Sequence, residues 1–359
     1  MIRGVLAVVL LCVAAAHAHA QQEWSTPNEG DFVLRDYRFG SGEVLPELKQ
    51  HYLTLGTPRR DAAGDIVNAI LLLHGTAGSS RTWLQGTTPA ELFAPGQPFD
   101  ATRYFVIIPD SIGSGLSSKP SDGLRAAFPH YRYQDVVRAQ HRLLTERLGI
   151  RRLHVVAGAS MGGMQTWLWG TMYPDFMSAL VPIASQPTAM SGRNWIARKI
   201  RIEAIKNDPL WKTGKAADGG PFYIYTLPIA QLNTDSAIGL QQAAPTRAAA
   251  DAEYARLVAN ARQIEPFNQV YSLEASMDYD PQPDLHKIKA PLLAINFADD
   301  EINPPELGVV EPAIDKIAHA RYVLVPAGPD TRGHYTYQIP AMWKTHLASF
   351  MATLEAVPK

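Results

Sequence analysis

One serine, set between glycines, is the residue best suited to covalent chemistry. The segment GASMG at residues 158–162 matches the pattern G-x-S-x-G, with Ser160 at its centre. An apolar run typical of a buried strand precedes it, and residues typical of a helix follow. A sharp turn between the two would lift the serine oxygen clear of the sheet, where helix amides favour negative charge. We therefore expect Ser160 to be a nucleophile; the alternative is a structural turn that merely contains serine.

A serine hydroxyl needs a base, and an acid should orient that base. In sites of this kind the chain order is serine, acid, histidine. The histidines after Ser160 are His286, His319, His334 and His346. His334 is the candidate base, because it lies in a glycine-bearing loop after the last strand-like run. His319 and His346 have helical surroundings, and His286 precedes a strand with no special support.

The candidate acid lies in a cluster of carboxylates after the apolar run at residues 290–297. Asp299, Asp300 and Glu301 all follow that run, at the strand end where sites in parallel sheets gather. Adjacent carboxylates also occur in solvated loops, but their position after a strand favours a functional role for one of them. Spacing alone does not choose between Asp299 and Asp300.

Backbone amides must stabilise the oxyanion of a tetrahedral intermediate. One donor should be the N–H of Met161, which follows the nucleophile. The other should come from the loop HGTAGSS at residues 74–80, with the N–H of Thr76 as first candidate and Gly75 next. Loss of such a donor typically costs about 2.7–4 kcal/mol. The alternative for this loop is an ordinary glycine turn.

Short apolar runs that alternate with helical segments must position these residues. The runs span residues 32–39, 51–56, 68–75, 103–110, 152–158, 179–185, 290–297 and 321–328. Those in the middle are almost continuously apolar, as in parallel strands covered on both faces. A helical stripe spans residues 133–149. This alternation predicts the α/β class.

The chain divides into four predicted parts. Residues 1–20 form a signal peptide, 21–185 the first part of the core, 186–285 a helical lid, and 286–359 the second part of the core. The lid region has no convincing buried strand but has helical stretches at residues 194–209 and 246–263.

The N-terminus has the pattern of an export signal. Arg3 precedes an apolar run at residues 5–16, and Ala18-His19-Ala20 forms a small-x-small cleavage site. The run is shorter than the roughly 20 residues that span a bilayer, although an uncleaved membrane anchor is the alternative. The only cysteine, Cys12, lies in this segment, so the mature chain has no thiol. We expect a periplasmic or secreted protein with no membrane attachment after cleavage.

Composition excludes several function classes. The chain has 359 residues, 46% of them hydrophobic and 19% charged, with a net charge of −1. A sizeable core is expected, and there is no general attraction to nucleic acid or anionic membranes. The sequence has no clustered metal-ligand spacing and no P-loop. We predict no metal and no organic cofactor.

Several segments together resemble the homoserine O-acetyltransferase family of α/β-hydrolases. They are HGTAGSSRTW, IGSGLSSKPSDG, FPHYRYQDVVRAQHRLLTERLGI, VVAGASMGGMQTWLWGTMYPD and ADDEINPPE, with GH at 333–334. The similarity covers roughly residues 69–351 and is weakest across the lid. It implies an α/β-hydrolase fold: a mostly parallel central sheet of about eight strands, helices on both faces and a helical lid insertion. It also aligns Asp300 with the family's acid and His334 with its histidine, although Asn303 replaces an aromatic residue.

One departure from that family and one match to it bear on the substrate. Tyr335 stands where the transferases have an aspartate that meets the homoserine amine, so an amino-acid acceptor is doubtful. Arg201 stands in the lid where the family has an arginine that pairs with the homoserine carboxylate. Arg201 and Tyr335 are therefore candidate substrate-binding residues; the alternative for Arg201 is a solvated helix arginine.

These observations favour an exported serine esterase that acts on a small-molecule ester through an acyl-enzyme on Ser160. One alternative is an O-acyltransferase that passes the acyl group to an alcohol acceptor. Another is a binding protein on a hydrolase scaffold, against which the complete triad in the expected order argues. The resemblance allows a homodimer formed through the lid, and the residues themselves leave the oligomeric state open.

Overall fold

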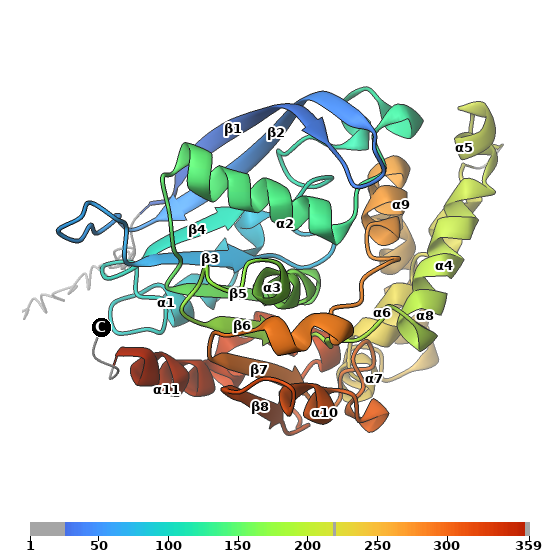
Figure 1. The fold of residues 1–359 in the computed structure, drawn as a ribbon. Coiled ribbons are helices and arrows are strands. Elements are labelled where there is room, and N and C mark those ends of the chain that lie inside the picture. The colour runs from blue at the N-terminus through green and yellow to red at the C-terminus, as the bar shows by residue number, and fades with distance from the viewer. Residues whose placement is uncertain (1–25, 218–219, 356–359) are drawn as a thin grey trace, which may run out of the picture.

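A single mixed sheet organises the fold (Figure 1). The computed structural model describes residues 26–217 and 220–355. The sheet has eight strands in the order β1-β2-β4-β3-β5-β6-β7-β8. The strands are β1 (Asn28–Arg38), β2 (Val44–Leu55), β3 (Ala69–Leu73), β4 (Phe105–Pro109), β5 (Val155–Ala159), β6 (Leu180–Ile183), β7 (Leu292–Phe297) and β8 (Ala320–Val325). Each predicted apolar run overlaps one of these strands, so the predicted α/β fold class is confirmed.

The sheet has an antiparallel part at its N-terminal edge and a parallel part that contains the other strands. β1 and β2 form an antiparallel hairpin, and β2 also pairs antiparallel with β4. From β4 to β8 all neighbours are parallel. Every residue of β3 to β7 is buried, which explains why their sequences are apolar without alternation.

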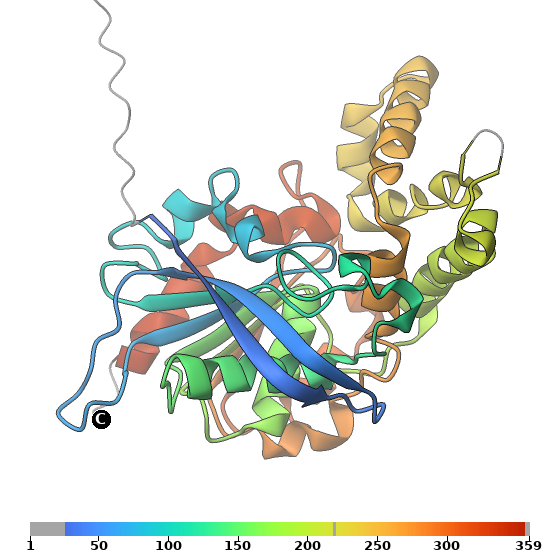
Figure 2. The ribbon, with the colours of Figure 1, turned by 90° about the horizontal axis from the view of Figure 1, so that it is seen from above.

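Helices cover both faces of the sheet. Figure 2 shows α2 (Tyr133–Arg142) and α3 (Met161–Met172) on one side, with α1 (Thr88–Leu92) and α11 (Lys344–Glu355) on the other. Successive side chains of a strand point to opposite faces. Leu71 and Leu73 of β3 therefore pack in one hydrophobic cluster, and Ile70 and Leu72 pack in the other.

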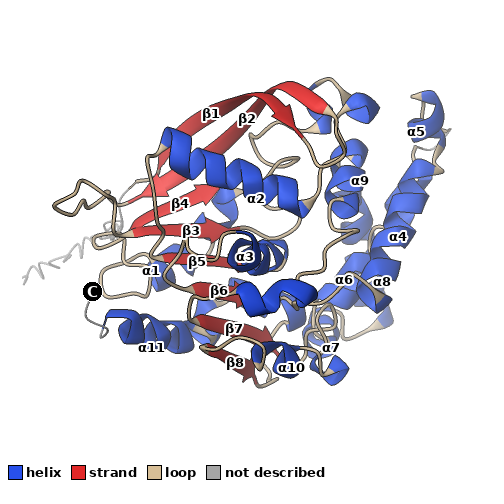
Figure 3. Cartoon of the chain, viewed as in Figure 1, coloured by secondary structure: helices blue, strands red, loops and turns tan. Residues whose placement is uncertain are grey.

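Between β6 and β7 the described residues form helices and no strand (Figure 3). These helices are α4 (Gly192–Lys206), α5 (Pro209–Thr213), α6 (Ile229–Thr234), α7 (Ala237–Ala243), α8 (Arg247–Ala261) and α9 (Pro266–Glu274). We call α4 to α9 the lid. They stand beyond the carboxyl ends of the parallel strands (Figure 1) and have a small apolar cluster of their own, with Ile205 and Leu273 fully buried in it.

The helix expected at residues 133–149 is shorter and less regular than predicted. α2 ends at Arg142, and Leu143–Arg147 form one wider π-type turn. There the N–H of Leu148 donates to the carbonyl of Leu143 at 3.1 Å. Leu143 and Leu144 are both completely buried in this turn.

The remaining helix of the second core part is α10 (Val310–Ile314). Across the described ranges, no helix has the length and apolar character needed to cross a membrane. The predicted signal peptide at residues 1–20, including Cys12, lies outside the described residues.

Candidate active site

Ser160 occupies a strained turn between β5 and α3. Its backbone has φ 56° and ψ −117°, a region that residues with a side chain seldom adopt. A Cβ on Gly158 would lie 2.5 Å from the carbonyl carbon of Gly162, and a Cβ on Gly162 would lie 2.3 Å from the carbonyl oxygen of Leu73. Only glycine fits at both positions, so the local sequence permits a turn that presents Ser160 at the carboxyl end of β5.

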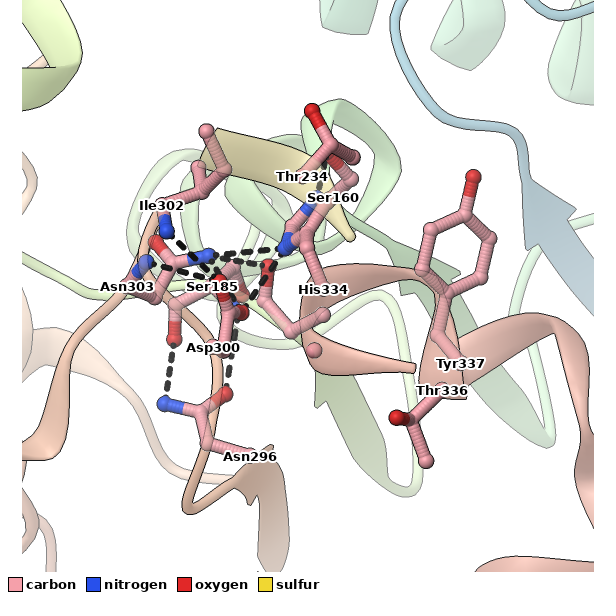
Figure 4. Close-up of polar contacts among 12 residues, drawn as sticks. Ser160, Ser185, Thr234, Asn296, Asp300, Ile302, Asn303, His334, Thr336 and Tyr337 are labelled. Atoms are coloured by element: carbon pink, nitrogen blue, oxygen red, sulfur yellow. Dashed lines mark hydrogen bonds and ion pairs between the residues drawn. The ribbon is translucent and has the colours of Figure 1, made fainter. Parts of the chain in front are cut away.

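The imidazole of His334 joins this serine to a carboxylate (Figure 4). Its Nε2 lies 2.8 Å from Oγ of Ser160, and its Nδ1 lies 2.7 Å from Oδ2 of Asp300. Both His334 and Asp300 are buried. With Nδ1–H donating to the carboxylate, Nε2 is left to accept the serine proton. The arrangement suits a nucleophile, a base and an orienting acid.

Several donors hold the Asp300 carboxylate in place. Its Oδ1 accepts from the backbone N–H groups of Ile302 and Asn303, at 2.8 and 3.0 Å. Its Oδ2 accepts from the side-chain amide of Asn303 at 3.2 Å, besides His334. A buried carboxylate with this many donors stays oriented toward the imidazole.

The two acids beside Asp300 contact other groups. Oδ2 of Asp299 accepts from the hydroxyl of Thr331 at 2.7 Å and from the N–H of Gly333 at 3.1 Å, so Asp299 holds the backbone of the loop that contains the histidine. Glu301 pairs with Arg193 on the surface. The different contacts thus show that Asp300, and not Asp299, is the acid beside His334, a choice that spacing alone left open.

The other candidate histidines do not reach the nucleophile. His286, His319 and His346 are exposed, and no contact joins any of them to Ser160 in the described part of the chain.

The loop after β3 passes beside the nucleophile. A Cβ on Gly75 would lie 3.4 Å from Cβ of Ser160. The carbonyl of Gly75 accepts from the N–H of Gly78 at 3.1 Å and lies 2.8 Å from Nδ1 of His74. In a trans peptide the following N–H points opposite to the carbonyl, so these bonds turn the N–H of Thr76 away from both donors.

The two predicted oxyanion donors are unused by the protein. Within residues 26–217 and 220–355, the backbone N–H groups of Thr76 and Met161 have no protein acceptor. An unused amide pair beside a nucleophile can bind a developing oxyanion.

His74 is held as a neutral donor. The N–H of Ser111 donates to its Nε2 at 3.0 Å, which leaves the proton on Nδ1, facing the carbonyl of Gly75. Burial lowers the pKa of His74, outweighing the bond to Gly75 and the charge of Asp110, which raise it. A neutral His74 therefore orients the peptide that contains the Thr76 amide.

Two arginines of α4, one buried and one partly buried, have no acid partner among the described residues. Arg198 is 6% exposed, and its Nε donates to Oδ1 of Asn194 at 2.9 Å, while its Nη1 has no partner. Arg201 is partly buried, and no carboxylate in the described residues pairs with it. Burial and the nearby charge of Arg198 lower the pKa of Arg201 to about 10, so it remains a cation at neutral pH. Buried charges are usually paired, which makes these two arginines unusual.

Tyr335, next to His334 in the chain, lies within electrostatic reach of Arg201. Burial and the charge of Asp235 raise the pKa of Tyr335, and the charge of Arg201 opposes this rise. Its hydroxyl lies 3.4 Å from Oε1 of Gln231 in α6. The two predicted substrate-binding residues therefore affect one another's pKa, Arg201 from α4 of the lid and Tyr335 from the histidine loop.

The lid contacts the histidine loop directly. Arg332 pairs with Asp235 through both ends of its guanidinium, with Nε donating to Oδ1 at 2.8 Å. The hydroxyl of Ser236 donates to the carbonyl of Thr331 at 3.2 Å. A Cβ on Gly333 would lie 2.9 Å from the backbone nitrogen of Ser236. The α6–α7 junction therefore packs against the loop that positions the base.

Comparison with known proteins agrees with this geometry. A family model described as the alpha/beta hydrolase fold matches residues 68–331. The chain belongs to the α/β-hydrolase fold family. Its relatives place it among the homoserine O-acetyltransferase-like members.

The relatives differ in the share of this chain that they match. A probable acyltransferase from Methanothermobacter thermautotrophicus is 29% identical over 298 residues, 82% of this chain and 89% of that protein. A homoserine O-acetyltransferase from Pelobacter propionicus is 41% identical over 199 residues, which is 50% of each chain. The chain thus spans about half the length of this transferase.

Among solved structures, an acetylester hydrolase from Corynebacterium glutamicum has the same α/β-hydrolase fold. It superposes with a TM-score of 0.77 at 20% sequence identity, covering 90% of this chain and 96% of that one.

Three positions of this α/β-hydrolase escaped the sequence analysis. His74 had a local signal, since it directly precedes the glycine of the loop after a strand. Arg198 lies three residues before Arg201, on the same side of a helix. Asp235 had none, because its partner Arg332 is 97 positions away.

A cavity lies between the core and the lid, next to the loop after β3. This cavity of about 380 Å³ is lined by Ala77 of the loop after β3, Ser114, and Gln269 of α9.

In the described part of the chain, no group of histidine, cysteine and acidic side chains could hold a metal ion.

Proposed function

We propose that this α/β-hydrolase is an exported serine esterase, which cleaves a carboxylic ester through an acyl-enzyme on Ser160. The central observation is the hydrogen-bonded series from Ser160 through His334 to Asp300. No other described histidine contacts the serine.

The reaction follows from these contacts. His334 takes the proton of Ser160 at Nε2 as Oγ attacks the ester carbonyl, and Asp300 stabilises the resulting imidazolium. The N–H groups of Thr76 and Met161 bind the oxyanion. The intermediate collapses as His334 gives its proton to the leaving alkoxide, which departs as an alcohol. Water then attacks the acyl-enzyme with His334 again as base, and the acid is released with Ser160 regenerated.

The lid points to the class of ester. Arg201 is a partly buried cation without a carboxylate partner among the described residues, so we propose that it binds a carboxylate of the substrate, beside Tyr335. A charge-assisted bond of this kind contributes about 1.5–3 kcal/mol. Tyr335 has no negative charge at neutral pH with which to attract an amine, so the substrate need not be an amino acid.

An acyltransferase is the second candidate, because the relative that matches 82% of this chain is described as a probable acyltransferase. The same acyl-enzyme would then pass its acyl group to an alcohol instead of water. Export favours hydrolysis, since acetyl-CoA is a cytoplasmic donor. N-terminal sequencing of the mature protein tests export, with Gln21 expected as the first residue.

The activity test is a series of p-nitrophenyl esters of increasing acyl length, each with and without alcohol acceptors. An esterase releases the free acid at a rate that acceptors do not change. Acyl-alcohol products that form at the expense of the acid would establish the transferase instead. Acetyl-CoA turnover is measured in parallel, and absence of Ser160 labelling by a fluorophosphonate would contradict both.

A further inference from the structure

Asn303 joins two parts of the site through its side-chain amide: the Asp300 carboxylate and the backbone that follows β6 (Figure 4). Its Nδ2 lies 3.2 Å from Oδ2 of Asp300 and 2.9 Å from the carbonyl oxygen of Ala184. Its backbone N–H also donates to Oδ1 of Asp300 at 3.0 Å. The residue is 7% exposed, so its amide forms hydrogen bonds with the protein and not with solvent.

The amide shares an acceptor with the catalytic base. Oδ2 of Asp300 receives both Nδ1–H of His334, at 2.7 Å, and the amide of Asn303. Nδ2 and Nδ1 are 3.4 Å apart, but both are donors, so the carboxylate oxygen lies between them as their common acceptor. A carboxylate that loses a donor attracts a neighbouring proton more strongly. The amide therefore weakens the hold of Asp300 on the imidazolium proton.

The second contact fixes the position of that amide. Ala184 follows β6 with φ 48° and is completely buried, a backbone that persists only where its surroundings hold it. Asn303 donates to its carbonyl. The next residue, Ser185, is held by a different amide, that of Asn296. Oδ1 of Asn296 accepts from the N–H of Ser185 at 3.0 Å, and Nδ2 of Asn296 donates to the carbonyl of Ser185 at 3.2 Å.

We propose that Asn303 is a positioning residue that limits how strongly Asp300 holds the proton of His334, and so sets the pH at which the base becomes free. This rests on the proposed function, because it needs His334 to act as the base. The other groups around the ring keep their contacts when Asn303 changes: Asp299 and Arg332 on the histidine loop, and Tyr337, whose ring meets the imidazole edge-on at 5.6 Å.

The kinetic test compares Asn303→Leu, Asn303→Ala and Asn296→Leu with the wild type, using p-nitrophenyl acetate across pH 5 to 9. In both Asn303 variants, the acid-side midpoint of kcat/KM should move to higher pH by roughly 0.5 unit or more. Asn296→Leu removes a neighbouring amide that ties β6 to β7 without touching Asp300, and its midpoint should not move. An unmoved midpoint in a folded Asn303 variant, or an equal shift in Asn296→Leu, overturns the proposal.

A spectroscopic test needs no turnover. In a Ser160→Ala background, the low-field NMR resonance of Nδ1–H of His334 should move further downfield when Asn303→Ala is added, because Oδ2 then has one donor fewer. A resonance that stays in place or moves upfield overturns the role of Asn303. Failure of the wild type to hydrolyse esters or react with a fluorophosphonate would instead contradict the proposed function, so the two failures are distinguishable.

Discussion

The carboxyl edge of the sheet, which we call the rim, and the lid differ in whether their polar side chains have partners within the protein. At the rim, Asp300 has donors on both oxygens and His74 has a partner at each ring nitrogen. In the lid, the buried Arg198 and the partly buried Arg201 are cations with no acid partner among the described residues. The catalytic carboxylate and His74 at the rim are thus paired within the protein, whereas the two lid arginines have no acid partner in the described part of the chain.

This difference in pairing indicates that the rim serves catalysis and that the lid serves the choice of substrate. Groups whose partners are already in place need no rearrangement as charge develops, which is how preorganised sites lower a barrier. A buried cation without a partner is costly until an anion arrives, so it discriminates between substrates. The rim should therefore determine the rate for any ester, and the lid should determine which ester binds.

Removal of the nucleophile should have the largest effect. Ser160→Ala is expected to lower turnover of every ester by several orders of magnitude, as loss of a triad member does. Circular dichroism and thermal melting should show that the fold survives. A variant with a near-normal rate would refute the assignment.

Release of the loop after β3 should have the next largest effect. His74→Leu removes one of the two donors to the carbonyl of Gly75 and leaves only the N–H of Gly78. The Thr76 amide is then less firmly oriented, and kcat should fall by up to 10²–10³-fold, the range for loss of one oxyanion donor. His74→Asn, whose amide can still donate to Gly75, should lose less. Equal losses in both variants, or none in either, would argue against an orienting role.

The lid should affect binding of one substrate class only. Arg201→Met is expected to raise KM for an ester with a free carboxylate by roughly 10- to 100-fold, because a charge-assisted bond is lost. Its neutral methyl ester should react as with the wild type. Arg193→Met, an exposed arginine on the same helix, is the matched control. Equal effects on charged and neutral esters would contradict the proposed carboxylate site.

The smallest effect concerns pH and stability. Burial lowers the pKa of His74, so the unfolded chain takes up this proton at a higher pH than the folded protein. Below about pH 6.5, the ordinary value for histidine, the unfolded state binds more protons, and the free energy of unfolding falls with falling pH. Above that pH, His74 contributes no such dependence.

Urea unfolding at pH 7, 6 and 5 measures this dependence. The decline between pH 6.5 and 5 should be smaller in His74→Asn than in the wild type. His319→Asn, which changes an exposed histidine, should keep the wild-type decline. A steeper decline in His74→Asn would contradict the expected sign.

Much of the fold and of the nucleophile's setting followed from the sequence, because the signals are local. Strands buried on both faces require continuous apolar runs, and each predicted run became a strand. The turn at Ser160 requires glycines at 158 and 162, where any Cβ would collide with the backbone. Helices α4 and α8 were also expected, since each is long enough to show its own pattern; the shorter helices α6, α7 and α9 are not.

Only the tertiary structure decided which side chains meet. Asp299 and Asp300 are adjacent and chemically identical, and spacing did not choose between them, although the family resemblance pointed to Asp300. The structure shows that Asp299 holds the histidine loop and Asp300 the imidazole. The pairing of Asp235 with Arg332, 97 positions apart, depends on how the lid packs over the sheet. Local periodicity specifies elements, but contacts across such separations depend on the path of the whole chain, which no short stretch of sequence encodes.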